Sequence, residues 1–257
     1  MTTQFANSVH DFQIAYAIQG EGPALLLVHG FNNERTMWQE YGWIAQLQDE
    51  FTVITIDLRG CGESTASHQP DHYTLAAHLA DVEAVLDACG VDRFCYWGWS
   101  FGATIGTHLA AQSDRLQQAV IAGTYFGPIF NTWHDDNLEI AHIAKVKREG
   151  RLTELELAEG KRQFAEAMDL DLFWARRYGA EQWPAVEPAN LRCPTLVYTG
   201  INDWRVVEVL REQQAAVEAA GQRLHIFDGF DHMQLVSERA TVTPLVTAFF
   251  HAAGDQR

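Results

Sequence analysis

Basic residues are scarce in this sequence. Its 18 lysines and arginines face 34 aspartates and glutamates, which gives a formal net charge of -16 at pH 7. Such an excess of negative charge repels nucleic acid phosphates and anionic lipid head groups. We therefore expect neither nucleic acid nor a membrane as a partner. The class of small-molecule substrate stays open, because a local cleft can carry either sign of charge.

Long apolar runs are also missing. Residues 1–7 have neither the basic residues nor the apolar stretch of a secretory signal, and no segment approaches the roughly 18 uninterrupted apolar residues of a membrane span. The composition, 47% hydrophobic and 20% charged, is that of an ordinary globular chain. We expect a soluble cytoplasmic protein, either a monomer or a homodimer.

Cysteine pairs of the C-x-x-C type are absent as well. The four cysteines are scattered through 257 residues, a pattern that is not typical of a disulfide scaffold. We expect free, mostly structural thiols, and neither a metal ion nor a cofactor. The cysteines are Cys61, Cys89, Cys95 and Cys193.

Short apolar runs indicate the strands. The alternating segment F-Q-I-A-Y-A-I, followed by the turn G-E-G-P, predicts an antiparallel edge strand over 12–18. Continuous apolar runs are typical of strands buried on both faces of a sheet. They occupy 24–28, 51–56, 94–97, 119–122 and 195–198, and a final strand is expected over 224–227.

Segments with helical spacing separate these strands. Leu75, Leu79 and Val82, for example, recur at three- and four-residue steps. Strands that alternate with helices predict an α/β fold, with a mainly parallel, doubly wound sheet of about eight strands and helices on both faces. The expected helices are 36–47, 74–89, 101–112, 206–220 and 237–250, the last of which Pro244 must kink or split.

The alternation stops between about residues 126 and 190, where helices over 137–149, 153–168 and 171–178 follow one another. An all-helical insertion after a parallel strand predicts a lid over the ends of the sheet. We therefore expect a core of 1–125 and 191–257, and a helical lid of 126–190. The lid is rich in aromatic side chains, which more often pack against a core than line a pocket. They are Trp133, Phe164, Phe173, Trp174 and Trp183.

One motif carries chemistry. Gly98-Trp99-Ser100-Phe101-Gly102 matches G-x-S-x-G and lies between the run F-C-Y-W and a helical segment. In this context the serine occupies a sharp strand-to-helix turn, and the glycines allow neighbouring backbone to pass closely. The N-terminal amides of the helix favour negative charge at the same point. An ordinary glycine turn is the competing interpretation.

A serine nucleophile needs a base, and the base needs a group that orients it. His232 follows the last expected strand in a loop, whereas His78, His108 and His142 fall within helical segments. We therefore expect His232 to be the base. Its orienting acid is expected to be Asp203, which follows the run T-L-V-Y, ahead of the competitors Asp228 and Asp231.

Acyl transfer also needs hydrogen-bond donors aimed at the developing oxyanion. The backbone N–H of Phe101, directly after the serine, is the first expected donor. The second is the N–H of Phe31 in Val28-His29-Gly30-Phe31, a strand end followed by a glycine bend. His29 is interpreted as a residue that braces this loop rather than as the base.

Together these residues resemble the α/β-hydrolase fold superfamily along nearly the whole chain. The resemblance is carried by H-G at 29–30, D-L-R-G-C-G-E-S at 57–64, the serine motif, G-I-N-D at 200–203 and D-H at 231–232. The order Ser, Asp, His is the one that this superfamily uses. It implies the same three catalytic residues and the same two oxyanion donors, and it implies that 57–64 is a structural loop near the site.

The resemblance narrows the reaction only in part. A serine at position 100 argues against the haloalkane dehalogenase and epoxide hydrolase branches, which use an aspartate there, and Phe31-Asn32-Asn33 departs from the glycine-rich loop of the carbon-carbon bond hydrolases. Carboxylesterases, lactonases and cofactor-free perhydrolases share every motif seen here. We expect hydrolysis of a carboxylic ester or lactone through an acyl-enzyme on Ser100.

Two alternatives stay open. The first is carbon-carbon bond cleavage or cofactor-free oxygen chemistry, in which His232 deprotonates the substrate directly. The second is a ligand sensor that keeps the three residues but works by binding. The aromatic lid favours an apolar substrate, and four residues are expected to contact it: Trp99, Trp133, Trp174 and Met233.

Overall fold

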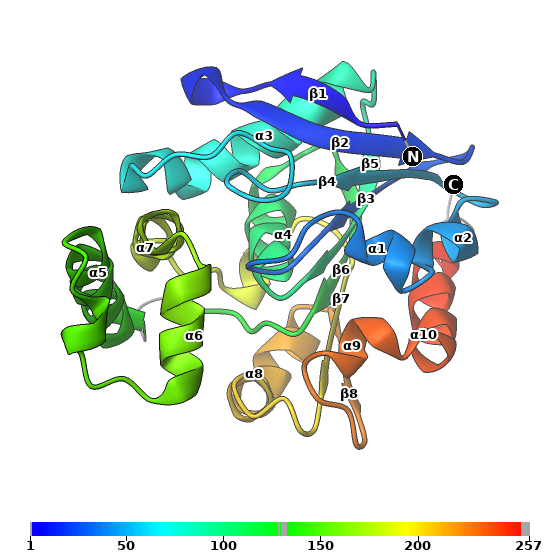
Figure 1. Cartoon of the computed structure of the whole chain (residues 1–257). Coiled ribbons are helices and arrows are strands. Elements are labelled where there is room, and N and C mark those ends of the chain that lie inside the picture. Colours follow the sequence, from blue (N-terminus) through cyan, green and yellow to red (C-terminus); the bar gives the residue numbers. More distant parts are fainter. Residues whose placement is uncertain (1, 128, 130–132, 253–257) are drawn as a thin grey trace.

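A twisted sheet of eight strands, in the order β1-β2-β4-β3-β5-β6-β7-β8, runs through the described part of the chain (Figure 1). The computed structural model describes residues 2–127, 129 and 133–252. β1 and β2 pair antiparallel, as do β2 and β4, and the other neighbours are parallel. The strands are β1 (Gln4–Asn7), β2 (Gln13–Gln19), β3 (Ala24–Val28), β4 (Thr52–Ile56), β5 (Phe94–Trp99), β6 (Leu116–Ala122), β7 (Thr195–Gly200) and β8 (Arg223–Phe227).

The sheet confirms the expected α/β fold and corrects one detail of it. β2 is antiparallel as predicted, but it is not the edge, because β1 pairs along its outer side with Gln4 opposite Tyr16. Only Ala6 of β1 is buried, and Phe5 is 49% exposed. A strand of four residues with one buried side chain has too little alternation to be recognised from its sequence.

The parallel strands bury both faces because successive side chains point to opposite sides. Leu26 and Val28 of β3 belong to one apolar core, together with helices α3, α4 and α8. Leu25 and Leu27 belong to the other core, which α1, α2, α9 and α10 cover. The core helices are α1 (Met37–Glu40), α2 (Trp43–Leu47), α3 (Leu75–Ala88), α4 (Phe101–Gln112), α8 (Val207–Ala219), α9 (Gln234–Ser237) and α10 (Arg239–Ala252).

Most of these helices lie where the sequence predicts them, with two differences. The helix expected over 36–47 is broken into α1 and α2 at Gly42, whose φ of 77° lies in the left-handed region. The helix expected over 237–250 is not split at Pro244, which lies inside α10. The break falls instead at Glu238, between α9 and α10, where ψ is 57°.

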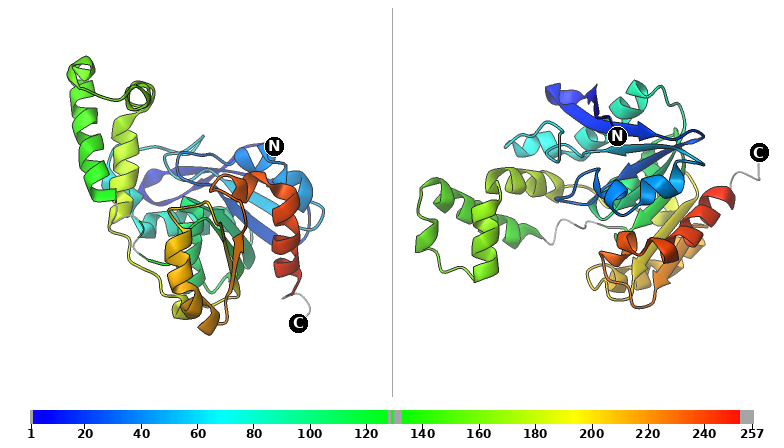
Figure 2. Two further views of the ribbon diagram at one scale, coloured as in Figure 1. Left: turned by 90° about the horizontal axis from the view of Figure 1, so that it is seen from below. Right: turned by 45° about the vertical axis from the view of Figure 1, so that its right-hand side comes forward.

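Helices follow one another between β6 and β7, as the sequence predicts. They are α5 (His134–Arg148), η4 (Leu152–Glu154), α6 (Glu159–Ala167), α7 (Leu170–Glu181) and η5 (Pro188–Asn190). Figure 2 shows α5, α6 and α7 as a group that stands beside the sheet. α7 packs against η2 (Pro70–Tyr73), and a Cβ at Gly179 would lie 2.5 Å from the carbonyl oxygen of Pro70.

The division of the chain at 126 and 190 stays a prediction. Residues 128 and 130–132, near its first boundary, lie outside the described residues. Among the helices that the structure does describe, none has the length and apolar character needed to cross a membrane.

The glycine after the serine turn gives a test of how tightly the core is packed. A Cβ at Gly102 would lie 2.3 Å from the carbonyl oxygen of Val28. We expect Gly102→Ala to lower the free energy of unfolding by about 1–3 kcal/mol or more, because backbone must move to admit the methyl group. Urea unfolding followed by circular dichroism measures this.

The matched control is Gly160→Ala. Gly160 lies on α6 in an exposed position, where an added Cβ would have no neighbouring atom within 4 Å. The change should therefore stay within about 0.5 kcal/mol. Equal stabilities of the two variants would contradict the close approach of α4 to β3.

Candidate active site

Ser100 lies at the turn between β5 and α4. Its φ of 55° and ψ of -116° are rare for a residue with a side chain and store strain in the backbone. The turn is held by a hydrogen bond from the Ser100 N–H to the carbonyl of Ala122, at 2.8 Å, at the end of β6. The residue is partly exposed. Ser100 is therefore presented at the carboxyl end of the central strands, next to the N-terminus of α4.

The glycines of the motif are needed for space. A Cβ at Gly98 would lie 2.5 Å from the backbone of Gly102, and a Cβ at Gly102 would meet the carbonyl oxygens of Val28 and His29. The Gly102 N–H donates to the His29 carbonyl at 3.1 Å, and its own carbonyl accepts from the buried Tyr96 hydroxyl at 2.5 Å. α4 thus begins in direct backbone contact with the end of β3.

His232 and Asp203 form a hydrogen-bonded pair, with 2.7 Å between Nδ1 and Oδ2. Asp203 follows β7 and is only 2% exposed, and its Oδ2 also accepts from Thr199 Oγ1 at 3.3 Å. A buried carboxylate needs such partners. Because the bond to Asp203 places the proton on Nδ1, Nε2 of a neutral His232 is left as an acceptor.

The competing carboxylates have other positions. Asp231 accepts from the N–H groups of Met233 and Gln234, each at 2.9 Å, at the start of α9. Asp228 is exposed after β8. Of the three carboxylates, Asp203 is therefore the one that is hydrogen-bonded to the His232 ring.

Trp99 connects His232 to the serine turn. Its indole Nε1 donates to the His232 carbonyl at 3.1 Å, and the two ring centroids are 5.1 Å apart. On the other side, a Cβ at Gly123 would lie 3.0 Å from His232 Cε1, so the ring rests on the backbone that follows β6. The Ser100 N–H binds the same strand end. His232 thus contacts Trp99, the residue before Ser100, and Gly123, the residue after the Ala122 that accepts from the Ser100 N–H.

Ser100 Oγ makes no hydrogen bond to another described residue. In ligand-free enzymes such bonds are often long and form fully only with substrate bound.

The loop after β3 passes next to Ser100. A Cβ at Gly30 would lie 3.1 Å from Ser100 Cβ. The rings of Phe31 and Phe101, the two residues whose amides are expected to form the oxyanion hole, meet edge to face with centroids 5.4 Å apart. Asn32 follows with a φ of 59°, which bends the chain away from the strand. The structure therefore brings the expected amides to the same edge of the sheet.

His29 braces this loop, as predicted. It is fully buried, with Nδ1 2.7 Å from the Gly30 carbonyl and Nε2 accepting from the Leu58 N–H at 3.0 Å. Burial lowers its pKa to about 4, so the ring is neutral at pH 7. It connects the loop after β3 to the D-L-R-G segment after β4.

That segment is structural, as the resemblance implies. The fully buried Asp57 carboxylate accepts from the backbone N–H of Arg35 at 2.7 Å and pairs with its guanidinium. Arg59 and Asp81, also fully buried, pair through two bonds of 2.6 Å. Asp57 thus secures the far end of the loop that contains Phe31.

Aromatic side chains from the segment between β6 and β7 reach the same loop. The Phe31 ring has its centroid 5.9 Å from that of Trp133 and 5.5 Å from that of Phe173. Arg177 lies over Trp133, at 4.1 Å from its ring centroid. This segment and the loop after β3 therefore share one aromatic cluster, made of Phe31, Phe101, Trp133 and Phe173.

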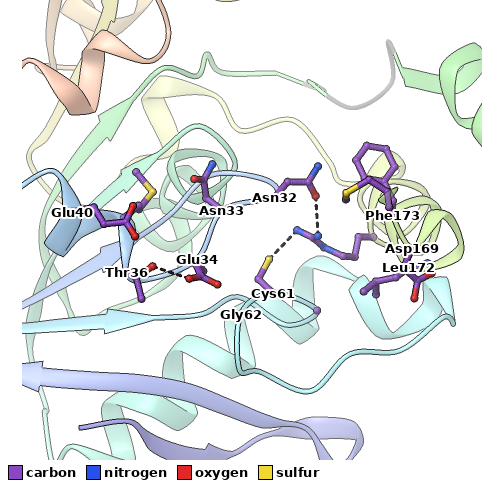
Figure 3. A pocket seen from close by; sticks show the side chains of 14 residues that line it. Asn32, Asn33, Glu34, Thr36, Glu40, Cys61, Gly62, Asp169, Leu172 and Phe173 are labelled. Atoms are coloured by element: carbon purple, nitrogen blue, oxygen red, sulfur yellow. Dashed lines mark hydrogen bonds between the residues drawn. The ribbon is translucent and has the colours of Figure 1, made fainter. Parts of the chain in front are cut away.

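A pocket of about 380 Å³ opens beside this cluster (Figure 3). It lies between the loop after β3, the Gly60–Gly62 turn and the start of α7. Its lining mixes polar residues, among them Asn32 and Arg176, with apolar ones, and Phe173 belongs both to the pocket and to the aromatic cluster. Ser100 does not line it, so the pocket adjoins the candidate site without containing it.

The residues expected to contact substrate are placed differently from one another. Trp133 lies in the aromatic cluster and Met233, 42% exposed, lies next to His232. Trp174 stacks on Tyr178 with centroids 5.0 Å apart, and Tyr178 is 45% exposed. Trp99 is 3% exposed, and its indole Nε1 donates to the His232 carbonyl. The residues next to Trp99 in the sequence do not reveal this contact. No three histidine, cysteine, aspartate or glutamate side chains gather as metal ligands among the described residues.

The sheet, the strained serine turn and the hydrogen-bonded His–Asp pair define an alpha/beta hydrolase architecture. The family model of the alpha/beta hydrolase fold matches residues 23–156. The chain belongs to this family.

Among its relatives, the chain is 36% identical over 105 residues to a fluoroacetate dehalogenase from a Burkholderia species, which covers 40% of this chain and 34% of that protein. It is 36% identical over 102 residues to a pimeloyl-[acyl-carrier protein] methyl ester esterase from Vibrio campbellii, which covers 40% of this chain and 37% of that protein. The matches thus span about a third of these curated relatives' length.

Solved structures resemble the chain over nearly its whole length. The enol-lactonase from Burkholderia xenovorans superimposes with a TM-score of 0.75 at 22% identity, covering 96% of this chain and 100% of that one. This likeness is one of fold.

Three buried histidines make stability depend on pH. Burial lowers the pKa to about 4 for His29 and His108 and to about 3 for His78. The unfolded chain takes up these protons near pH 6.5, whereas the folded protein does so only near those lower values. The free energy of unfolding therefore falls as the pH drops below 6.5, by about 1.4 kcal/mol per pH unit for each histidine.

His78→Leu isolates one of these contributions. Between pH 6.5 and about pH 5 we expect the variant to lose about 2 kcal/mol less stability than wild type, as measured by urea unfolding at both pH values. Replacement of the exposed His142 by glutamine is the matched control for removing one histidine. An unchanged pH dependence in His78→Leu would contradict a buried neutral His78.

Proposed function

We propose that this protein is a serine hydrolase that cleaves a carboxylic ester or lactone through an acyl-enzyme on Ser100. The observation that carries the proposal is the 2.7 Å hydrogen bond between His232 and Asp203. His232 also contacts Trp99, which directly precedes Ser100 and its strained strand-to-helix turn. This arrangement supplies a nucleophile, a base and an orienting carboxylate at one edge of the sheet.

The first step is attack of Ser100 Oγ on the substrate carbonyl. His232 Nε2 takes the hydroxyl proton, since Nδ1 donates to Asp203. The buried Asp203 carboxylate fixes the tautomer and stabilises the imidazolium that forms. The same imidazolium then protonates the leaving alcohol as the tetrahedral intermediate collapses.

The oxyanion that develops in this step is proposed to bind the N–H groups of Phe31 and Phe101. The support is the position of the loop after β3, whose Gly30 closely approaches Ser100 Cβ. The N-terminus of α4 adds a favourable dipole at the same place. Water activated by His232 then releases the acid and restores Ser100.

The names of two similar proteins support ester or lactone chemistry. One relative is a methyl ester esterase, and one structure of the same fold is an enol-lactonase. Another relative is a fluoroacetate dehalogenase. Displacement of a halide by Ser100 would leave an alkyl ether that water does not readily cleave, whereas an acyl-serine ester is hydrolysable. We therefore propose acyl transfer rather than dehalogenation.

We also propose that α5, α6 and α7 form a lid whose aromatic side chains select an apolar group of a small-molecule substrate. Trp133 and Phe173 support this, because both contact the Phe31 ring. Trp99 is proposed to position His232 instead of touching the substrate, because its indole is buried and bonded to the His232 carbonyl.

Ser100→Ala tests the nucleophile. With p-nitrophenyl esters we expect kcat to fall by about 10³-fold or more, and Asp203→Asn should cost about 10³ to 10⁴-fold because the wrong tautomer of His232 is then favoured. Wild type should be labelled on Ser100 by a fluorophosphonate. Equal turnover by wild type and Ser100→Ala would refute the proposal.

A substrate panel separates the alternative reactions. Esters, lactones and β-diketones are offered to wild type, and the products are analysed. Release of acids from esters or lactones supports the proposal, whereas cleavage of the diketones alone would favour carbon-carbon bond hydrolysis. Ligand-induced thermal stabilisation without turnover of any compound would favour a sensor.

Trp99→Phe tests the support of His232. Loss of the indole hydrogen bond, which contributes about 0.5–1.5 kcal/mol, should lower kcat about 3- to 10-fold while KM changes little. The control is Trp97→Phe on the same strand, which loses a similar bond of 3.2 Å to the Tyr198 hydroxyl. If both variants lose kcat equally, the effect is one of core packing and the role of Trp99 is wrong.

A further inference from the structure

Arg176 is a buried arginine that joins the lid to the loop after β3. It belongs to α7 and is 7% exposed. Its Nη1 donates to Asn32 Oδ1 at 3.0 Å and its Nη2 contacts Cys61 Sγ at 2.9 Å (Figure 3). Its Cζ lies 4.3 Å from the ring centroid of Phe31. One side chain of the lid thus holds two consecutive residues of this loop.

The surroundings of Arg176 are unusual for a guanidinium. Among the described residues it forms no salt bridge, although a buried charge is costly without a carboxylate partner. Its partners are an amide oxygen, an aromatic face and a thiol, and burial raises the pKa of that Cys61 thiol to about 11, so that it is neutral. Packing alone would be served better by an apolar side chain.

Asn32 is the point at which this contact acts on the loop. Its φ of 59° is in the left-handed region, which asparagine tolerates better than most residues but which still requires support. Its side chain is held by Arg176. The peptide before Asn32 carries the Phe31 carbonyl, and the Phe31 N–H lies in the next peptide towards Gly30. Because Arg176 also lies over the Phe31 ring, the loss of both contacts would leave these two peptides free to turn together.

The loop is held by the core at other points. His29 binds the Leu58 N–H, and Arg35 is secured by Asp57. Phe31 and Asn32 lie between these two anchors, and Asn33 donates its N–H to Gly30 within the turn, at 3.2 Å. Among the described residues, Arg176 of α7 is the side chain from outside the loop that donates a hydrogen bond to its middle.

We propose that Arg176 is a positioning residue that holds the Phe31 N–H in the orientation needed for the oxyanion, so that the lid helix α7 completes the oxyanion hole. This inference rests on the proposed function. A lid that moves away removes the guanidinium from Asn32 and Phe31 and leaves the loop free to turn. Activation of Ser100 by His232 does not depend on this contact.

The experiment compares Arg176→Met, Arg176→Lys, Asn32→Gly and the double variant Arg176→Met with Asn32→Gly. Glycine at 32 removes the acceptor and still permits a positive φ. The control is Arg148→Met, which changes an exposed arginine of α5 that pairs with Asp171 in the first turn of α7. Steady-state kinetics on an ester gives kcat and KM separately.

We expect Arg176→Met to lower kcat about 10- to 100-fold with KM within about 3-fold, because a displaced donor is lost mainly in the transition state. Arg176→Lys should lose less kcat than Arg176→Met does, and the kcat of Arg148→Met should stay within about 2-fold of wild type. The kcat of the double variant should lie within about 3-fold of the kcat of the slower single variant, because both substitutions break the same Arg176–Asn32 hydrogen bond. A raised KM with unchanged kcat, or fully multiplicative losses, would overturn the inference.

Hydrogen exchange of the backbone amides in 29–36 gives a second readout that needs no turnover. Arg176→Met should exchange faster there than wild type, while Arg148→Met should not. Unchanged exchange in Arg176→Met overturns the positioning role even if an ester is hydrolysed. Failure of the proposed function is detected separately, as a wild-type protein that neither hydrolyses esters nor reacts with a fluorophosphonate.

Discussion

The close backbone contact between α4 and the end of β3 is the constraint on which the candidate site depends. The Gly102 N–H donates to the His29 carbonyl, and any side chain at 102 would collide with Val28. Because α4 begins at this contact, the turn that precedes it must be sharp, and Ser100 takes its strained conformation. The same contact sets where β3 ends and where the Phe31 loop begins. Ser100, the proposed nucleophile, and the proposed oxyanion donors are therefore positioned by one piece of packed backbone.

Two ionisable side chains next to this contact, His29 and Asp57, are neutral or paired. His29 is neutral because burial lowers its pKa to about 4, and Asp57 is satisfied by Arg35. The carboxylate that faces the candidate base is Asp203, bonded to His232 at 2.7 Å. In surroundings of low polarity a fixed pair of this kind acts strongly on a charge that develops nearby. His29 and Asp57 thus have structural roles, and the pair that takes part in the proposed chemistry is Asp203 and His232.

The sequence predicts those parts of the molecule whose signal is local. Strands buried on both faces leave continuous apolar runs, and Ser100 and Asp203 are candidates because each follows such a strand, β5 or β7. His232 is a candidate because it lies in the loop after the last strand, the partly buried edge strand β8. β1 escapes prediction because its four residues bury one side chain, and the break at Gly42 depends on a backbone angle that spacing does not encode. The roles of Trp99 and Arg176 are not readable from the sequence either. Their partners, His232 and Asn32, are distant in the chain, so only the folded backbone brings them together.

The two halves of the proposed chemistry are held by different parts of the fold. The base and its carboxylate lie in loops after β8 and β7, and Trp99 supports them from β5, so all of these contacts belong to the core. The loop that carries the second oxyanion donor is secured by the core at its ends and by Arg176 of α7 in its middle. In the proposed mechanism, a change in α7 would therefore leave proton transfer intact while it alters stabilisation of the oxyanion. Because oxyanion stabilisation acts mainly in the transition state, the proposed lid would control the rate of acyl transfer without touching Ser100.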